Sequence, residues 1–488
     1  MQIQLTTSPS PTADTLIIPI PQTDELADTL NTVASRFNLN ATVLQHDFKG
    51  DLKESLLLYQ PEGRKVYLLG LGKQPTAIVW LRAFRDLFFR QKARLSQTVG
   101  VDLSGFDTDV VEPVVLGIRW AGYNLKLHIS DQPESTDFYT EEGQLTIHVT
   151  DDQQVVAGQA IQRAEAIADT HRQMLDLMNS PSNYKTPQTL ADWATASGER
   201  YGYSVTVFDK AAIEQQGLHA LLSVNQGSAL PPVFIIAEYK PANQPDAKKV
   251  GLVGKGITFD TGGISIKPSA NMHLMKSDMG GAAAVLGTME VAAKLQLPVH
   301  LIGIVPSTEN MVDGQATKPG DVIGSYLGKT IEVIDTDAEG RIILADGLGY
   351  MVRNFQPDVL IDLATLTGSV ISTLGYHAAG LFSNNDELTA QLLQSARQTG
   401  EQLWPLPLWD EYKEDIKSDV ADLKNFSGKP MAGAISAAKF LEVFTESHPA
   451  WAHMDIAGMA FADTEFGTQK NATGFGIRLL VDFLRNLP

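Results

Sequence analysis

Near its middle the chain reads Val250-Gly-Leu-Val-Gly-Lys-Gly-Ile-Thr-Phe-Asp-Thr-Gly-Gly-Ile-Ser-Ile-Lys267. The mostly apolar run from Val250 to Phe259 predicts a buried strand, because strands covered on both faces are apolar along their whole length. The glycine pair that follows predicts a tight turn that returns the chain. Lys255 and Asp260 are the charged exceptions. This stretch therefore predicts a strand that carries charged side chains to one edge of a buried sheet.

Apolar runs and helical patterns alternate on both sides of this strand. Further strands are expected at 203–208, 233–239, 300–305, 330–334 and 359–363. Helices are expected at 281–295 and 341–355. Such alternation predicts an α/β domain with a central, mostly parallel or mixed sheet covered by helices on both faces. Open α/β sheets bind ligands beyond the carboxyl ends of their strands.

The part of the chain before this domain also alternates short strands with helices. A chain of 488 residues exceeds the usual size of one hydrophobic core. A long helical pattern at 153–178 ends at Asn179-Ser-Pro-Ser-Asn183, where proline and small polar residues break it. We therefore expect a smaller N-terminal α/β domain at residues 1–165 and a larger C-terminal α/β domain at 166–488.

Composition excludes several classes of partner and site. The chain has 38 lysine and arginine residues against 57 acidic residues, and this net charge of −19 argues against nucleic acid and anionic membranes as partners. It has no cysteine, so a metal would be held by oxygen or nitrogen. The first basic residue is Arg36, and no apolar run approaches the ~20 residues that span a bilayer. We expect a soluble cytoplasmic protein.

Carboxylates follow three of the expected strand ends. Asp260 closes one strand, Asp278 precedes a helix, and Asp337 and Glu339 lie between a strand and the next helix. Four carboxylates in one site would repel one another unless cations neutralise them. Divalent metals are the simplest explanation, and ligand chemistry alone does not choose among magnesium, manganese and zinc.

Two lysines belong to the same segments. Lys255 precedes Asp260 by five residues, and Lys267 follows the glycine turn. A lysine cannot ligate a metal while it is protonated, but a bound cation can displace the proton. Each residue taken singly is also compatible with a helix cap or a solvated surface charge. Capping does not explain why two lysines and four carboxylates converge around glycine-rich turns.

Three long motifs resemble the active-site segments of the leucyl aminopeptidase family, the cytosol aminopeptidases of peptidase family M17. They are Val253 to Lys267, Met275-Lys-Ser-Asp-Met-Gly-Gly281 and Asp335-Thr-Asp-Ala-Glu-Gly-Arg341. Asp335 stands where many members carry asparagine. The likeness covers the chain from about Leu177 to its end. It implies a metal-dependent exopeptidase that releases amino-terminal residues, preferably leucine and other apolar ones, and a macro-like N-terminal domain.

Carried over residue by residue, the resemblance implies two divalent ions per subunit, Zn²⁺ or Mn²⁺, with Mg²⁺ and Co²⁺ as alternatives. The implied metal ligands are Lys255, Asp260, Asp278, Asp337 and Glu339, with Asp260 and Glu339 bridging. Lys267 and Arg341 are the implied catalytic residues. Arg341 would hold a bicarbonate ion that serves as general base. The resemblance also implies peptide substrates and a homohexamer.

The resemblance further implies an apolar pocket for the side chain of the released residue. Its lining would be Met275, Thr365, Leu366, Gly368, Ala457 and Ala460. Several relatives have a bulkier residue where Ala460 stands. A pocket with one hydroxyl and no charge favours leucine and methionine, and the small Ala460 leaves room for phenylalanine.

Two alternative functions remain open. Some relatives bind DNA, and residues 80–95 contain Arg82, Arg85, Arg90, Lys92 and Arg94. Interleaved apolar residues indicate instead an amphipathic helix with a solvated basic face. A metal-dependent phosphohydrolase would also use two metals and carboxylates. The implied lysine ligand and the length of the motifs argue against it.

Overall fold

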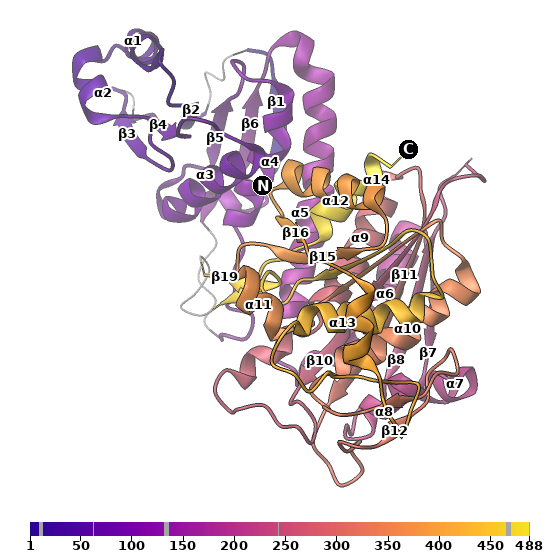
Figure 1. Ribbon diagram of the computed structural model, residues 1–488. Helices are drawn as coiled ribbons and strands as arrows, with labels where there is room; N and C mark the ends of the chain where they lie inside the picture. The colour runs from indigo at the N-terminus through magenta and orange to yellow at the C-terminus, as the bar shows by residue number, and fades with distance from the viewer. Residues whose placement is uncertain (9–12, 62, 131–135, 243, 465–469, 488) are drawn as a thin grey trace. The chain divides into compact units, whose positions relative to one another are not determined.

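A computed structural model describes residues 1–8, 13–61, 63–130, 136–242, 244–464 and 470–487. The chain folds as two compact units, Met1–Arg172 and Gln173–Pro488 (Figure 1). Within the described ranges, no helix is both long enough and apolar enough to cross a membrane.

The first unit contains a six-stranded sheet. Its strands are β1 (Gln2–Thr6), β2 (Thr15–Ile20), β3 (Ser55–Tyr59), β4 (Lys65–Gly70), β5 (Thr98–Asp102) and β6 (Gln144–His148). They lie in the order β1-β6-β5-β2-β4-β3, and β3 alone is antiparallel to its neighbour. β5 and β2 lie at its centre, and every residue of β2 is buried, as its continuous apolar pattern predicts.

Four main helices accompany this sheet: α1 (Leu26–Phe37), α2 (Ala41–Asp47), α3 (Ala77–Arg90) and α4 (Val111–Ala121). α3 is the helix that bears most of the basic residues noted above. Its apolar side chains Trp80, Phe84 and Phe88 are buried, whereas Arg90 is largely exposed and pairs with Asp86. This distribution is that of an amphipathic helix with a solvated basic face.

The helix α5 (Gln154–Asn179) ends at Asn179, just before Pro181. The next helix, α6 (Pro187–Tyr201), begins with proline at its first position and is capped by Thr186, whose hydroxyl accepts a hydrogen bond from the Thr189 amide. Proline at this position and a threonine cap are common helix starts. The break between the helices therefore follows from the local sequence.

The second unit is built on a nine-stranded mixed sheet. Its strands are β7 (Ser204–Phe208), β8 (Val233–Tyr239), β9 (Lys249–Gly254), β10 (Gly256–Asp260), β11 (His300–Asn310), β14 (Val359–Ala364), β15 (Ala379–Ser383), β16 (Leu403–Pro405) and β18 (Trp451–Asp455). The order is β16-β15-β18-β14-β9-β11-β8-β7, and β10 pairs with β11. β18, β14, β9 and β11 run parallel at the centre, whereas β8 and β15 are antiparallel to their inner neighbours.

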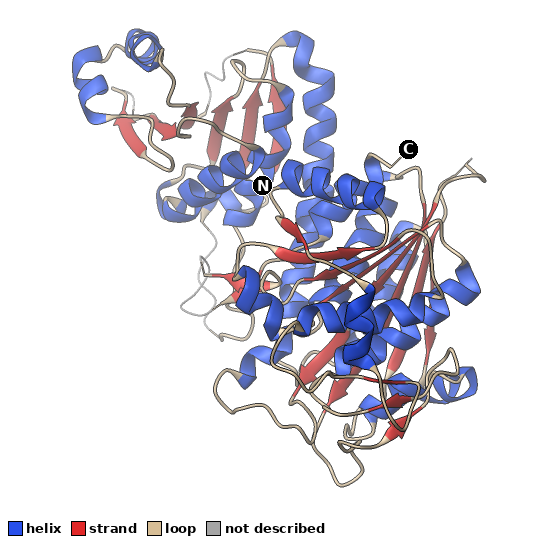
Figure 2. Cartoon of the chain, in the orientation of Figure 1, coloured by secondary structure: helices blue, strands red, loops and turns tan. Residues whose placement is uncertain are grey.

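Helices cover both faces of this sheet (Figure 2). α9 (Gly280–Leu295) packs on one face together with α6 and α14 (Ile477–Arg485). α10 (Glu339–Phe355) packs on the other face with α8 (His219–Asn225) and α13 (Gly433–Glu442). The remaining helices are α7 (Lys210–Gln216), α11 (Gly368–Leu374) and α12 (Asp386–Thr399). The expected fold class, two α/β domains of unequal size with a mixed sheet in the larger one, is confirmed.

Three details differ from the sequence expectations. The strand expected at 250–259 is two strands, β9 and β10, with Lys255 at the break between them. The strand expected at 300–305 continues to Asn310. The strand expected at 330–334 shrinks to β13 (Ile331–Glu332), which lies outside the main sheet between β12 (Val322–Ile323) and β17 (Leu423–Lys424). Asp337 and Glu339 therefore do not follow a strand of the main sheet.

Two glycines flank the break at Lys255 and permit close packing there. A Cβ on Gly254 would lie 2.5 Å from the carbonyl oxygen of Gly281, and a Cβ on Gly256 would lie 2.8 Å from the carbonyl oxygen of Pro306. The two glycines therefore allow the first turn of α9 and the neighbouring strand to approach closely. At this point the carbonyl oxygen of Lys255 accepts a 2.9 Å hydrogen bond from the Ala282 amide in α9, while the Lys255 amide donates to Leu363 of β14.

Candidate metal centre

Lys255 lies among three predicted site residues. Its side chain is almost fully buried, and its Nζ is 2.7 Å from Asp278 Oδ2 and 2.8 Å from Glu339 Oε1. The same nitrogen donates a 3.0 Å hydrogen bond to the carbonyl oxygen of Thr365. A Cβ on Gly340 would lie 2.6 Å from this nitrogen. The glycine after Glu339 therefore leaves the space that the lysine side chain occupies.

Asp260 lies at the end of β10 and joins the glycine turn to the rest of the cluster. Its Oδ1 accepts a 2.8 Å hydrogen bond from the Gly262 amide, and its Oδ2 is 2.9 Å from Lys267 Nζ. Lys267 also pairs with Asp337 Oδ1. Gly262 has φ +87°, and a Cβ there would lie 2.9 Å from Asp337. Glycine is therefore required for this turn on both conformational and steric grounds.

The carboxylates of Asp260, Asp337 and Glu339 converge. One oxygen from each lies within 4.8 Å of the others. Asp278 joins them through Lys255, which contacts both Asp278 and Glu339. The structure thus brings all five predicted metal ligands, together with Lys267, into one cluster. Their individual roles stay predictions.

The charges in this cluster strongly perturb one another. Burial raises the pKa of Asp278 and of Glu339, and neighbouring carboxylates raise them further. Burial, Asp260 and Glu339 raise the pKa of Asp337 to about 7. Burial alone would lower the pKa of Lys255 and of Lys267, but the surrounding carboxylates raise both above their ordinary values. The two lysines partly offset the negative charge of these carboxylates.

The donor set fits divalent cations. Glu339 Oε2 is buried and has no hydrogen-bond partner among the residues that the structure describes. A buried carboxylate oxygen without a partner is costly, and a cation would satisfy it. Carboxylate oxygens suit manganese, magnesium and zinc, and a bound cation favours the neutral form of Lys255.

Arg341 lies two residues beyond Glu339 in the first turn of α10. Its Nη1 donates a 2.8 Å hydrogen bond to the carbonyl oxygen of Asn425, whereas its buried Nε has no partner among the described residues. Burial lowers the pKa of Arg341 to about 10, and Glu339 acts in the opposite direction. The guanidinium therefore stays charged at neutral pH and has one donor free for an anion.

Four residues of the predicted side-chain pocket lie in the loops that follow β14 and β18. A Cβ on Gly280 would lie 2.8 Å from the Cβ of Ala460 and 3.3 Å from Cγ2 of Thr365, so these two predicted lining residues flank the start of α9. Asp455 Oδ1 accepts hydrogen bonds from the amides of Leu366 and Ala457, both at 3.2 Å. Gly368 begins α11, and Met275 lies in the 3₁₀ turn Met272–Ser277 before Asp278.

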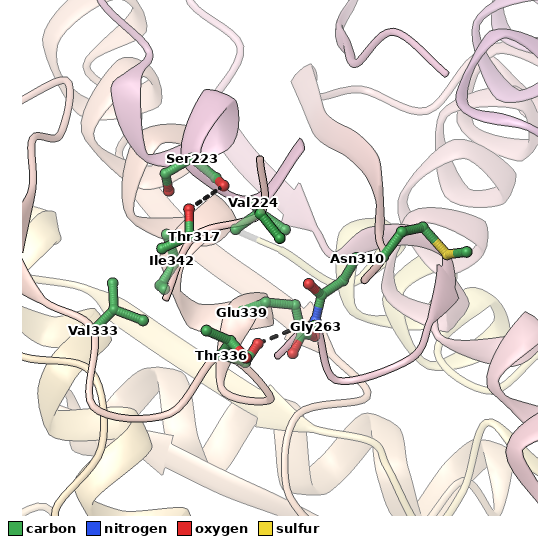
Figure 3. Close-up of a pocket in the computed structure, with 11 residues that line it drawn as sticks. Ser223, Val224, Gly263, Asn310, Thr317, Val333, Thr336, Glu339 and Ile342 are labelled. Carbon is green, nitrogen blue, oxygen red and sulfur yellow. Dashed lines mark hydrogen bonds between the residues drawn. The ribbon is translucent and has the colours of Figure 1, made fainter. Parts of the chain in front are cut away.

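A separate pocket adjoins Glu339 on the side of α8 (Figure 3). It encloses about 300 Å³ of space, part of it open to solvent. Gly263, Asn310, Thr336 and Glu339 contribute to its lining. None of the six residues predicted to surround the released side chain lines it.

Sequence reasoning missed three buried polar residues that hold the site. Asn310 donates to Asp260, Asp455 holds two predicted pocket residues, and Asn425 accepts from Arg341. The Asn425 side chain also accepts a 2.8 Å hydrogen bond from the Ile334 amide, in the loop that leads to Glu339. Asp455 lies at a strand end and could have been noticed there. Asn310 was hidden because its strand was expected to end at Val305.

Comparisons with known proteins agree with this geometry. Residues 17–147 match the N-terminal domain of the cytosol aminopeptidase family, and residues 173–481 match its catalytic domain. Two relatives named as probable cytosol aminopeptidases match almost the whole chain. That of Chloroherpeton thalassium is 43% identical over 97% of each chain, and that of Chlorobium limicola is 40% identical over 99% of each.

A solved structure supports the same relationship. It is described as the bottromycin maturation enzyme BotP in complex with Mn, and it is 30% identical with a TM-score of 0.84, covering 98% of this chain and 100% of that one. Family, fold and clustered carboxylates all agree with the resemblance that the motifs predicted. The chain belongs to the cytosol aminopeptidase family and is a metal-dependent exopeptidase.

Proposed function

We propose that the chain releases leucine and other apolar residues from the amino ends of peptides with two divalent ions. The proposed metal ligands are Lys255, Asp260, Asp278, Asp337 and Glu339. The observation that carries this proposal is the convergence of three carboxylates within 4.8 Å, with both motif lysines paired to them. The related BotP structure contains Mn, which favours Mn²⁺ over Zn²⁺, Mg²⁺ or Co²⁺ as the first ion to test.

The chemistry divides between the ions and the side chains. Two bound divalent ions supply an activated water and polarise the scissile carbonyl. Lys267 remains partly exposed, with 21% of its side chain accessible, so its ammonium group can reach a substrate while Asp260 and Asp337 hold it. A fixed cation is most effective where negative charge develops, and Lys267 would stabilise the oxyanion.

Arg341 is proposed to hold a bicarbonate ion. Its Asn425 contact fixes the guanidinium, and the unpartnered Nε is a donor for a planar anion. A bicarbonate held there would accept the proton released during hydrolysis. Met275, Thr365, Leu366, Gly368, Ala457 and Ala460 would surround the side chain of the released residue. We also propose a cytoplasmic homohexamer, on family resemblance alone, and light scattering that shows a monomer would contradict that assembly.

Metal analysis of the full-length protein tests this function. We expect two ions per chain, loss of activity on chelation, and recovery of leucyl anilide hydrolysis when Mn²⁺ or Zn²⁺ is restored. Aryl phosphates serve as the control substrate, because a metal-dependent phosphohydrolase would turn them over. Full peptidase activity without metal, or turnover of aryl phosphates alone, would contradict the proposal.

A further inference from the structure

We propose that Asn310 is a positioning residue for the metal centre. Its side-chain amide holds Asp260 at a fixed distance from the loop that carries Asp337. The inference rests on the proposed function, because it concerns two residues proposed there as metal ligands. Neither the charge pattern nor the family motifs quoted above point to Asn310.

The geometry is that of a bridge between two segments. Asn310 is the last residue of β11 and is only 4% exposed. Its Nδ2 donates one hydrogen bond of 2.8 Å to Asp260 Oδ1. The same nitrogen donates another of 3.1 Å to the carbonyl oxygen of Thr336 (Figure 3). Asp260 ends β10, and Thr336 immediately precedes Asp337. A single amide group therefore connects two segments that each supply a carboxylate.

These bonds also select which oxygen of Asp260 faces the centre. Oδ1 accepts from both the Gly262 amide and Asn310, each at 2.8 Å. Oδ2 instead faces Lys267, which also pairs with Asp337. A carboxylate whose one oxygen is fixed by two donors loses little further freedom when the other oxygen binds a cation.

Asn310 is itself held in place from several sides. Its carbonyl oxygen accepts hydrogen bonds of 2.9 Å from both the amide and the hydroxyl of Thr261. A Cβ on Gly263 would lie 3.0 Å from Asn310 Oδ1 and 2.9 Å from the Thr336 hydroxyl oxygen. The glycine turn therefore packs directly against this amide. The backbone of Asn310 is thus anchored by Thr261, and its side chain packs against Gly263.

A purely structural role is the alternative, and the same unit offers a matched control. Asn225 is also 4% exposed and donates from Nδ2 to the carbonyl oxygen of Leu230 at 2.8 Å and to Thr308 Oγ1 at 3.0 Å. Neither of these hydrogen bonds involves a proposed metal ligand. Leucine has nearly the shape of asparagine but donates no hydrogen bond, so Asn310→Leu and Asn225→Leu remove equivalent interactions.

Mn²⁺ alone, titrated into the chelator-treated full-length protein, tests the inference. Free Mn²⁺ is measured by electron paramagnetic resonance, so the readout does not depend on turnover. We expect Asn310→Leu to bind Mn²⁺ about 10 to 100 times more weakly than the wild type, the usual loss for a partner that orients a ligand. Asn225→Leu should bind as the wild type does.

The outcomes separate the inference from the function on which it rests. Wild-type protein that fails to bind two Mn²⁺ ions would overturn the proposed function. Normal affinity in Asn310→Leu, or an equal loss in both leucine variants, would overturn the role of Asn310 and leave the function intact. Circular dichroism of the metal-free variants checks folding. If Asn310→Leu does not fold, Asn310→Ser, whose hydroxyl is too short to bridge both segments, should show the same loss.

Discussion

The hydroxyl of Thr365 donates a 2.7 Å hydrogen bond to Oδ1 of Asp278. A residue predicted to line the side-chain pocket thus directly holds a predicted metal ligand. The carbonyl oxygen of Thr365 accepts from Lys255, which pairs with the other oxygen of Asp278. If both predicted roles hold, recognition of the substrate side chain and placement of the metal are coupled through one threonine.

Replacing Thr365 with valine should separate these two tasks. Valine keeps the shape and the apolar wall but removes the donor to Asp278, so metal affinity should fall roughly 10-fold or more. Thr365→Ser keeps the donor and should bind metal nearly as the wild type does. Titration of Mn²⁺ into both metal-free variants measures the difference. Equal affinities would show that the hydroxyl does not orient Asp278.

Asp260→Ala and Glu339→Ala should each abolish activity and metal loading together. Both residues belong to the group of carboxylates that converges within 4.8 Å, and both are proposed to bridge the ions. Removing a bridge leaves both sites incomplete. Metal content measured by mass spectrometry on desalted protein, beside a leucyl anilide assay, checks this expectation. Two ions retained by either variant would refute the ligand assignment.

Lys267→Ala should keep its metals and lose turnover. The loss should be about 2.7 kcal/mol or more of transition-state stabilisation, roughly a hundredfold in kcat, as for removal of an oxyanion donor. Lys417→Ala removes an exposed lysine whose Nζ lies 2.5 Å from Glu414, and serves as the control. Steady-state kinetics separate kcat from KM. A rise in KM with unchanged kcat would contradict the proposed role.

A buried aspartate outside the cluster should give stability a measurable pH dependence. Asp346 is fully buried and accepts hydrogen bonds from the amides of Leu221 and Tyr326, yet burial raises its pKa to about 7. In the unfolded chain an aspartate titrates near ~3.9. Between these values the folded protein binds a proton that the unfolded chain has released, so the free energy of unfolding falls as pH rises.

Asp346→Asn removes this titration. The wild type should lose stability relative to the variant between about pH 4 and about pH 7, by at most roughly 4 kcal/mol over the whole window. Urea unfolding of both proteins at several pH values, each without metal, measures the difference. Parallel stability profiles would mean that folding does not raise the pKa of Asp346.

The sequence predicted the strands and turns that have a local residue pattern. It missed the features that depend on tertiary contacts. Continuous apolar runs identified β8 and β14, and the glycine turn after Asp260 was recognised because few residues adopt positive φ. The break at Lys255 was missed; it lies where α9 closely approaches Gly254. The local sequence pattern does not indicate which helix packs against this position.

The site residues also divide into those that the sequence predicted and those that it missed. Charged residues in long motifs predicted the cluster, since unbalanced charge is visible in a single sequence. Asn310 and Asn425 carry no charge and lie far from the ligands along the chain, so only the fold shows that they contact Asp260 and Arg341. The small sheet that holds β13 was also hidden, because its strands are only two residues long.

Substrate preference gives the last prediction. Thr365 and Ala460 lie against the start of α9 at Gly280, and neither carries a charge that could pair with a lysyl or glutamyl side chain. Leucyl and methionyl anilides should therefore be cleaved best, with phenylalanyl anilide accepted because Ala460 is small. One methylene in an apolar pocket contributes only about 1 to 3 kcal/mol, so the preference should be graded. Ala460→Met should reduce kcat/KM for phenylalanine more than for leucine, and efficient release of glutamate by the wild type would show that these residues do not form the pocket.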